Sequence, residues 1–93
     1  MSEKRIMITS KFSRWYRAYD MARRVSRGQT LKSVGIIYGV SQERVRQICG
    51  RVIRRAERNG CDVALNDTTT RWLRHNKHVV EREYRDFLTN PLI

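Results

Sequence analysis

Four side chains that stand close together in the sequence, Gln42, Glu43, Arg46 and Gln47, are of the types that can hydrogen-bond to the edges of nucleic-acid bases. A glutamine amide can hold adenine by two hydrogen bonds, a carboxylate can accept one from cytosine, and a guanidinium can pair with guanine or with a phosphate. On a helix that begins near Ser41, these four residues point away from the apolar stripe of the same helix. They are therefore candidates for base reading in the major groove of duplex DNA.

The basic residues are concentrated in the first two-thirds of the chain. Residues 1–60 contain fifteen Lys or Arg and four Asp or Glu, so they hold the whole net charge of +11, whereas residues 61–93 contain five of each sign. Sixteen of the twenty basic residues are arginine, the residue best suited to phosphate and guanine contacts. This asymmetry favours a polyanion-binding module joined to a structural or partner-binding one. Further along the same expected helix, four arginines form another basic surface: Arg51, Arg54, Arg55 and Arg58.

The elements that must position these side chains follow the pattern of a helix-turn-helix. Thr30 can cap a helix over residues 31–38, and Ser41 can cap a second helix that reaches about residue 58. The turn between them falls on residues 39–40. The buried positions of the motif are then apolar, and the inner stripe of the second helix continues beyond them: Val34, Tyr38, Val40, Val45, Ile48, Cys49, Val52 and Ala56.

Two glycines make this pattern more specific than a plain helical hairpin. Gly35 stands where the two helices cross most closely, and Gly39 stands in the turn, where the backbone must be left-handed. A chance pair of amphipathic helices would rarely supply both. In this frame Cys49 faces the interior, which favours a small core residue over a ligand or a nucleophile.

The rest of the chain also favours helices. Apolar residues at three- and four-residue spacing predict a first helix over 13–27, and a further helix is expected over about 67–88, before Asn90 and Pro91. We therefore divide the chain into an N-terminal arm at 1–12, a helix-turn-helix module at 13–60, and a linker plus an amphipathic helix at 61–93. The predicted fold class is all-α, a small helical bundle of about four helices.

The helix expected near the C-terminus has a broad apolar face that includes Trp72, Tyr84 and Phe87. Ile36 and Ile37 also need a cover, because their positions in a helix-turn-helix are normally open to solvent. These five residues are our candidates for a partner-binding surface. We expect the C-terminal helix to pack on the first or second helix of its own chain and to cover one or both isoleucines. The alternative is that two chains exchange this face in a dimer.

The motif resembles the fourth conserved region of bacterial primary sigma factors, whose hallmarks are a T-L-x-x-V-G start and an E-R-[IV]-R-Q-I recognition helix. Both stand here at the family's spacing, in residues 30–35 and 43–48, and the resemblance covers about 30–58. It implies base reading by Glu43 and Gln47, phosphate or base-edge contacts by Arg44 and Arg46, and a role at promoters with RNA polymerase. The full set of backbone candidates is Lys32, Ser41, Arg44, Arg51, Arg54, Arg55 and Arg58.

The chain departs from the family pattern in four ways. Gln42 stands where the family usually has a base-reading arginine, and residues 49–50 replace an acidic residue followed by alanine. Gly50 should loosen its helix by about 1 kcal/mol relative to alanine. Ile36 and Ile37 stand where the family tends to be polar. Nothing resembles the sigma regions that melt the start site or hold the polymerase clamp, so we do not expect a complete sigma factor.

We expect no catalytic site, no metal site and no cofactor. Cys49 and Cys61 lack zinc-finger spacing, and His75 and His78 beside Glu81 fit a salt-bridged helix surface better than a nuclease site. The apolar run at residues 6–8 is too short to enter a membrane. The expected protein is a cytoplasmic, bacterial or bacteriophage regulator that binds double-stranded DNA as a monomer or homodimer. The alternatives are a module that binds RNA polymerase or a sigma factor, including a split sigma-like subunit, and a phage DNA-packaging subunit.

Overall fold

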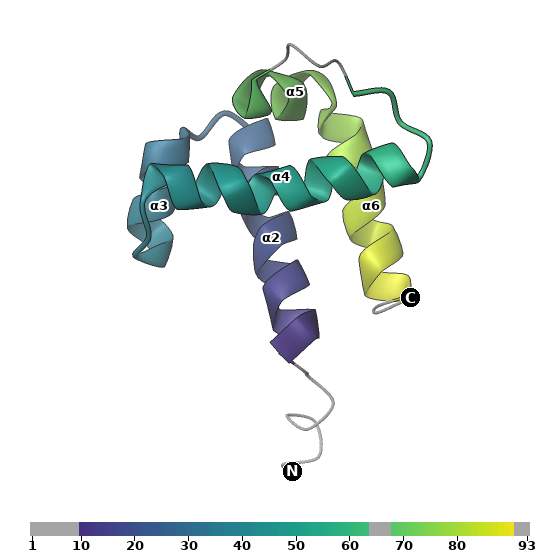
Figure 1. Cartoon of the computed structure of the whole chain (residues 1–93), viewed down its shortest axis with the longest axis horizontal. Helices are drawn as coiled ribbons and strands as arrows, with labels where there is room; N and C mark the ends of the chain where they lie inside the picture. The colour runs from purple at the N-terminus through teal and green to yellow at the C-terminus, as the bar shows by residue number, and fades with distance from the viewer. Residues whose placement is uncertain (1–9, 64–67, 91–93) are drawn as a thin grey trace.

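A computed structural model describes residues 10–63 and 68–90 of the chain. These residues form five helices and no strand, so the predicted all-α fold is confirmed. The helices are α2 (Ser10–Ser26), α3 (Leu31–Tyr38), α4 (Gln42–Arg58), α5 (Thr69–His75) and α6 (Lys77–Thr89). Figure 1 shows α4 crossing in front of α2, with α3 at one end of α4, α6 toward the other end and α5 above the middle.

The first described helix, α2, lies at the centre of the bundle and contacts each of the other four helices. It begins at Ser10, three residues earlier than the sequence pattern predicted, and the turn after it contains Gly28 at φ 115°. The earlier start has a tertiary cause, because the ring of Phe12 stacks on Phe87 of α6 at a centroid distance of 5.0 Å. The expected arm at 1–12 therefore has helical residues at its end, and residues 1–9 lie outside the described part.

The C-terminal region differs from the single helix that we expected, because it divides at Asn76 into α5 and α6. Asn76 has a non-helical ψ of 36°, and its side-chain amide donates to the carbonyl oxygen of Trp72 at 3.0 Å. The break changes the direction of the chain, so that apolar residues of both halves reach one core. The bundle therefore has one more helix than expected among the described residues.

The two C-terminal helices pack on α2 of their own chain, as we expected, and also on α4, which we did not expect. Apolar side chains from four of the helices meet there, and the fully buried ones include Tyr19, Met21, Ile48, Trp72, Leu73 and Phe87. The expectation that this packing would cover Ile36 and Ile37 was wrong, because these side chains are 74% and 53% exposed. The reason is placement, since α5 and α6 lie against α2 and α4, whereas the isoleucines lie on the outer side of α3.

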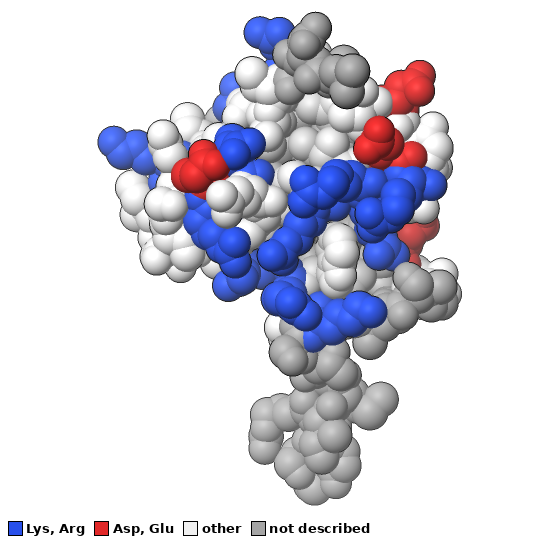
Figure 2. Space-filling model, in the orientation of Figure 1, with Lys and Arg blue, Asp and Glu red and all other residues white. Residues whose placement is uncertain are grey.

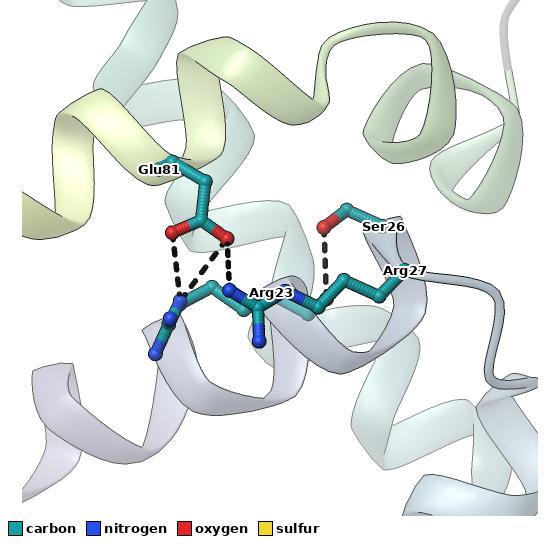
Figure 3. Close-up of polar contacts among 4 residues, drawn as sticks. All are labelled: Arg23, Ser26, Arg27 and Glu81. Atoms are coloured by element: carbon teal, nitrogen blue, oxygen red, sulfur yellow. Dashed lines mark hydrogen bonds and ion pairs between the residues drawn. The ribbon is translucent and has the colours of Figure 1, made fainter.

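Polar contacts fasten this C-terminal unit to the rest of the bundle. Glu81 of α6 accepts from Arg23 Nε of α2 at 3.1 Å and from Nη2 of Arg27, the residue directly after α2, at 2.9 Å (Figure 3). Arg74 of α5 donates to backbone carbonyls in the turn after α2, at 3.2 Å for Gly28 and 3.2 Å for Gln29. Because that turn leads directly into α3, these contacts help to hold α3 and α4 in place.

Candidate DNA-binding surface

The candidate DNA-binding surface is positioned by helices α3 and α4 and by the short turn between them. The side chain of Thr30 accepts from the backbone N–H of Ser33 at 3.0 Å, and the side chain of Ser33 accepts from the backbone N–H of Thr30 at 3.2 Å. This reciprocal cap fixes the start of α3. Gly39 ends the helix in the left-handed conformation, at φ 70° and ψ 31°. The predicted helix-turn-helix is therefore present with the expected bounds.

The turn that leads into α4 packs directly against Gly35 of α3. A Cβ atom built on this residue would lie 2.5 Å from the backbone carbonyl oxygen of Val40, a distance that a real Cβ does not adopt. The backbone N–H of Val40 donates to the carbonyl oxygen of Gly35 at 2.9 Å, so the close approach is also a hydrogen-bonded one. The crossing therefore depends on the absence of a side chain at Gly35.

A polar contact joins α3 to α2. The hydroxyl of Tyr38 donates to the carboxylate of Asp20, which also accepts from Arg24 Nε at 3.0 Å. Burial and the hydrogen bond to Asp20 raise the pKa of Tyr38 to about 12. Burial alone would raise the pKa of Asp20, but the hydrogen bonds from Tyr38 and Arg24 lower it overall. The tyrosine therefore keeps its proton at neutral pH and anchors the end of α3.

Helix α4 begins at Gln42 with Ser41 as its cap, whose side chain accepts from the backbone N–H of Arg44 at 3.1 Å. Its predicted inner stripe is buried, namely Val45, Ile48, Cys49, Val52 and Ala56, and Ile53, which was not predicted, is buried beside it. Burial raises the pKa of the Cys49 thiol to about 12, so this cysteine is an inert core residue at neutral pH. The stripe fixes the rotation of α4 and thereby decides which side chains face outward.

All four base-reading candidates are exposed at the N-terminal end of α4: Gln42, Glu43, Arg46 and Gln47. Two of them form an ion pair, in which Arg46 Nε donates to Glu43 Oε1 at 2.9 Å and Arg46 Nη2 donates to Glu43 Oε2. The hydrogen bond from Arg46 lowers the pKa of Glu43, so the carboxylate is ionised at neutral pH. Sequence reasoning treated these two residues as separate readers, whereas the structure brings them together.

A comparison with known protein families found a family model that matches part of this scaffold. Residues 17–56 match the family model for sigma-70, region 4, a span that covers most of α2, all of α3 and nearly all of α4. These residues form a sigma-70 region 4-like domain. No curated protein and no solved structure showed a significant match to the chain.

The match indicates which kind of domain this is and which residues belong to it. Region 4 is a DNA-binding helix-turn-helix related to sigma factors, and it is a regulatory domain rather than an enzyme family. The match begins within α2, thirteen residues before the first residue of the motif that we recognised in the sequence. The match lies within the module that we placed at 13–60, and it includes part of α2. Within the described residues, no helix is long and apolar enough to cross a bilayer.

The backbone-contact candidates of the region 4 domain lie along α4 and at both ends of α3. Lys32, Ser41, Arg44, Arg54 and Arg58 are exposed, whereas Arg51 and Arg55 are half-buried. Figure 2 shows Lys and Arg atoms as a band that crosses the face of α4 and continues below it over the first turns of α2. The band is interrupted by acidic residues only near its ends, so the face that carries the base-reading candidates has a strongly positive potential.

Three of the five candidate partner-binding residues pack in the core or against it. Trp72 and Phe87 are each 2% exposed and lie in the core, and Tyr84 is half-buried against α2. Trp72 and Phe87 therefore offer no surface to a partner, which corrects our expectation, and Tyr84 keeps only part of its surface. Of the five candidates, Ile36 and Ile37 are the exposed ones.

The histidine pair near the C-terminus has no chemical partner in the structure. Glu81, the carboxylate that could have joined it, is engaged with Arg23 and Arg27. Among the described residues, no group of three or more His, Cys, Asp or Glu side chains is arranged to hold a metal ion. His75 and His78 are exposed residues at a helix surface.

Proposed function

We propose that this protein is a transcription regulator that binds duplex DNA sequence-specifically through the N-terminal end of α4 and acts at promoters together with RNA polymerase. The observation that carries the proposal is the exposure of all four base-reading candidates at the capped start of the second helix of a region 4-like domain. Domains of this family bind DNA and machinery associated with RNA polymerase. A protein with this function would act in the cytoplasm of a bacterium or of a phage-infected cell.

The ion pair between Glu43 and Arg46 supports base reading by these two residues. A guanidinium that a carboxylate already orients loses less conformational freedom when it meets a base edge. With the arginine held in this way, its remaining N–H groups can donate to guanine, and the free lone pairs of the carboxylate can accept from cytosine. Gln42 and Gln47 flank the pair on the same exposed end and can contact the neighbouring base pairs.

The test is a selection on randomised duplex DNA with the wild-type protein and with Gln47→Ala and Glu43→Ala. Each variant should lose discrimination at the base pair that its side chain reads, by roughly 1–3 kcal/mol per base pair. Glu57→Ala is the matched control, because it removes an exposed carboxylate from the other end of the same helix. If both variants select the wild-type sequence, the N-terminal end of α4 does not read bases.

A second candidate function is supported by the two exposed isoleucines of α3. Large apolar side chains that remain accessible in a small domain often mark a protein-binding site. In this alternative the protein is a module that binds RNA polymerase or a sigma factor, either as an adaptor or as a split sigma-like subunit, and DNA contact is secondary. Ile36 and Ile37 would then supply the apolar part of the interface.

The adaptor role predicts that Ile36→Ser with Ile37→Ser abolishes co-purification with RNA polymerase subunits from nuclease-treated bacterial lysate. Duplex DNA binding by the same variant should be unchanged. Leu88→Ser is the control, because Leu88 is an exposed apolar residue at the far end of α6. If the double variant retains the polymerase subunits, the isoleucines are not its contact. Loss of the subunits from the control as well would show that the assay does not report a specific surface.

A further inference from the structure

The arginines of α2 fall into two groups with different surroundings. In the C-terminal half of the helix, Arg23 pairs with a carboxylate of α6 and Arg24 with a carboxylate of α2 itself, and Arg27, directly after the helix, pairs with the same α6 carboxylate as Arg23. In the N-terminal half, Arg14 and Arg17 make no ion pair within the described residues. The first group therefore holds the fold together, and the second group leaves its positive charge available to a ligand.

The unpaired group continues the buried face of α2. Ala18 and Met21 belong to the core, and one or two helical turns before them the same face carries Lys11, Arg14 and Arg17. The side chains on this face thus change from apolar to cationic. Figure 1 shows why, because α2 passes behind α4 and its first turns extend beyond it. We call these three residues the α2 stripe.

One member of the α2 stripe is held in an unusual setting. The Nε atom of Arg17 is buried and has no hydrogen-bond partner within the described part of the chain. A half-buried guanidinium without a counter-charge is unfavourable, and an anion bound beside it would supply that charge. This side chain is therefore placed by packing rather than by an ion pair.

The α2 stripe and the basic residues of α4 share one edge of the molecule. Arg44, Arg51 and Arg55 are spaced seven and four apart, so they lie along one side of α4. The guanidinium carbon of Arg55 is 5.2 Å from the centroid of the Trp15 ring, which places this side of α4 against the N-terminal half of α2. Figure 2 shows the result as one band of Lys and Arg atoms that runs from α4 onto α2.

The length of α4 determines what such a band can contact. Glu43 and Arg54 are eleven residues apart, which is about 16 Å along a helix axis, and the major groove is only about 12 Å wide. If α4 enters the groove with its N-terminal end first, the second half of the helix extends past the groove and lies beside the sugar-phosphate backbone. The α2 stripe lies at that second half, through the contact between Arg55 and Trp15.

We propose that the α2 stripe, together with the Arg51 side of α4, is a second phosphate-binding surface. It holds the backbone of the same duplex outside the groove that α4 reads. The inference rests on the proposed DNA-binding function and extends it, since it turns the N-terminal half of α2 from scaffold into part of the interface. Its contacts are with phosphates, so they add affinity and salt dependence but no sequence preference.

The test compares two full-length double variants on a mixed-sequence duplex that extends several helical turns. Lys11→Gln with Arg14→Gln removes two charges from the stripe and leaves the half-buried Arg17 intact. Arg82→Gln with Arg85→Gln removes two exposed charges from α6 and is the matched control. Each phosphate contact contributes about −0.9 to the slope of log affinity against log salt, so the stripe variant should have a slope less negative by about 2. Its affinity deficit should be about tenfold larger at 50 than at 200 mM salt.

A hydroxyl-radical footprint gives a second readout. The stripe variant should lose protection at one flank of the wild-type footprint and keep it over the central base pairs, and its selected sequence should be unchanged. If it matches the control in slope and in footprint, the α2 stripe does not touch DNA, although the proposed function stands. If it weakens binding only to the separated single strand, the surface has a different ligand and the inference is wrong. If the wild-type protein binds no duplex, both proposals fail.

Discussion

Trp72→Ala should lower the free energy of unfolding by about 3–5 kcal/mol, the range found for truncation of large aromatic residues in protein cores. Trp72 is 2% exposed, it belongs to the core that α5 shares with α2 and α4, and its indole N–H donates to the carbonyl oxygen of Asp62 at 3.5 Å. In a chain of 93 residues such a loss is a large part of the total stability, and the melting temperature should fall by about 15 °C or more.

The measurement is thermal unfolding followed by circular dichroism, with His75→Ala as the control on the exposed side of the same helix. The control should melt close to the wild type. At a temperature where Trp72→Ala is still folded, its affinity for duplex DNA should be preserved, because the indole ring is far from the exposed side of α4. A variant that melts with the wild type would mean that the C-terminal unit does not pack on the region 4 domain.

The helix-turn-helix could be predicted closely from the sequence because its signals are local. Thr30 and Ser41 cap helices that begin at the next residue, and Gly39 adopts the left-handed conformation that the turn requires. The inner stripe of α4 follows a period that a helical wheel shows directly. The outward positions of the base-reading candidates then follow from that stripe without further information.

The pairing of charges could not be predicted in the same way. No local sequence signal distinguishes Arg24 and Arg27 from Arg14 and Arg17. Arg27 and its neighbour Arg23 are instead neutralised by Glu81, which is more than fifty residues away in sequence. Which arginines remain available to DNA therefore depends on how α6 packs against α2, and this packing belongs to the tertiary structure.

The division of the C-terminal region into two helices also depends on tertiary packing. A straight helix over 67–88 would place its apolar residues along one line, whereas α5 and α6 each contact both α2 and α4. The break at Asn76 resolves this conflict, and its side-chain bond to the carbonyl oxygen of Trp72 caps the end of α5. The packing of α5 and α6 on α2 and α4 also explains why Trp72 and Phe87 are core residues. An apolar helix face that packs on its own chain has the same sequence pattern as one that binds a partner.

Gly35→Ala and Gly50→Ala should change stability in opposite directions, although each adds one methyl group to a helical glycine. At Gly35 the new Cβ would lie 2.5 Å from a backbone carbonyl oxygen, so α3 and α4 must move apart. Overpacking of this kind costs about 1–3 kcal/mol. At Gly50 the nearest atom is the flexible Nη1 end of Arg54, at 3.4 Å, and alanine in a helix interior is favoured by about 0.5–1 kcal/mol.

The consequence for DNA binding separates the two variants further. Moving α4 away from α3 changes the angle at which Glu43 and Gln47 meet the groove, so Gly35→Ala should lose affinity for the selected duplex even under conditions where it is fully folded. Gly50→Ala should keep that affinity, because the inner stripe of α4 is unchanged. Denaturant unfolding and fluorescence anisotropy on the same samples measure both effects. Equal stability of the two variants would show that the helices do not cross at Gly35, and the assignment of α4 as the recognition helix would then lose its geometric basis.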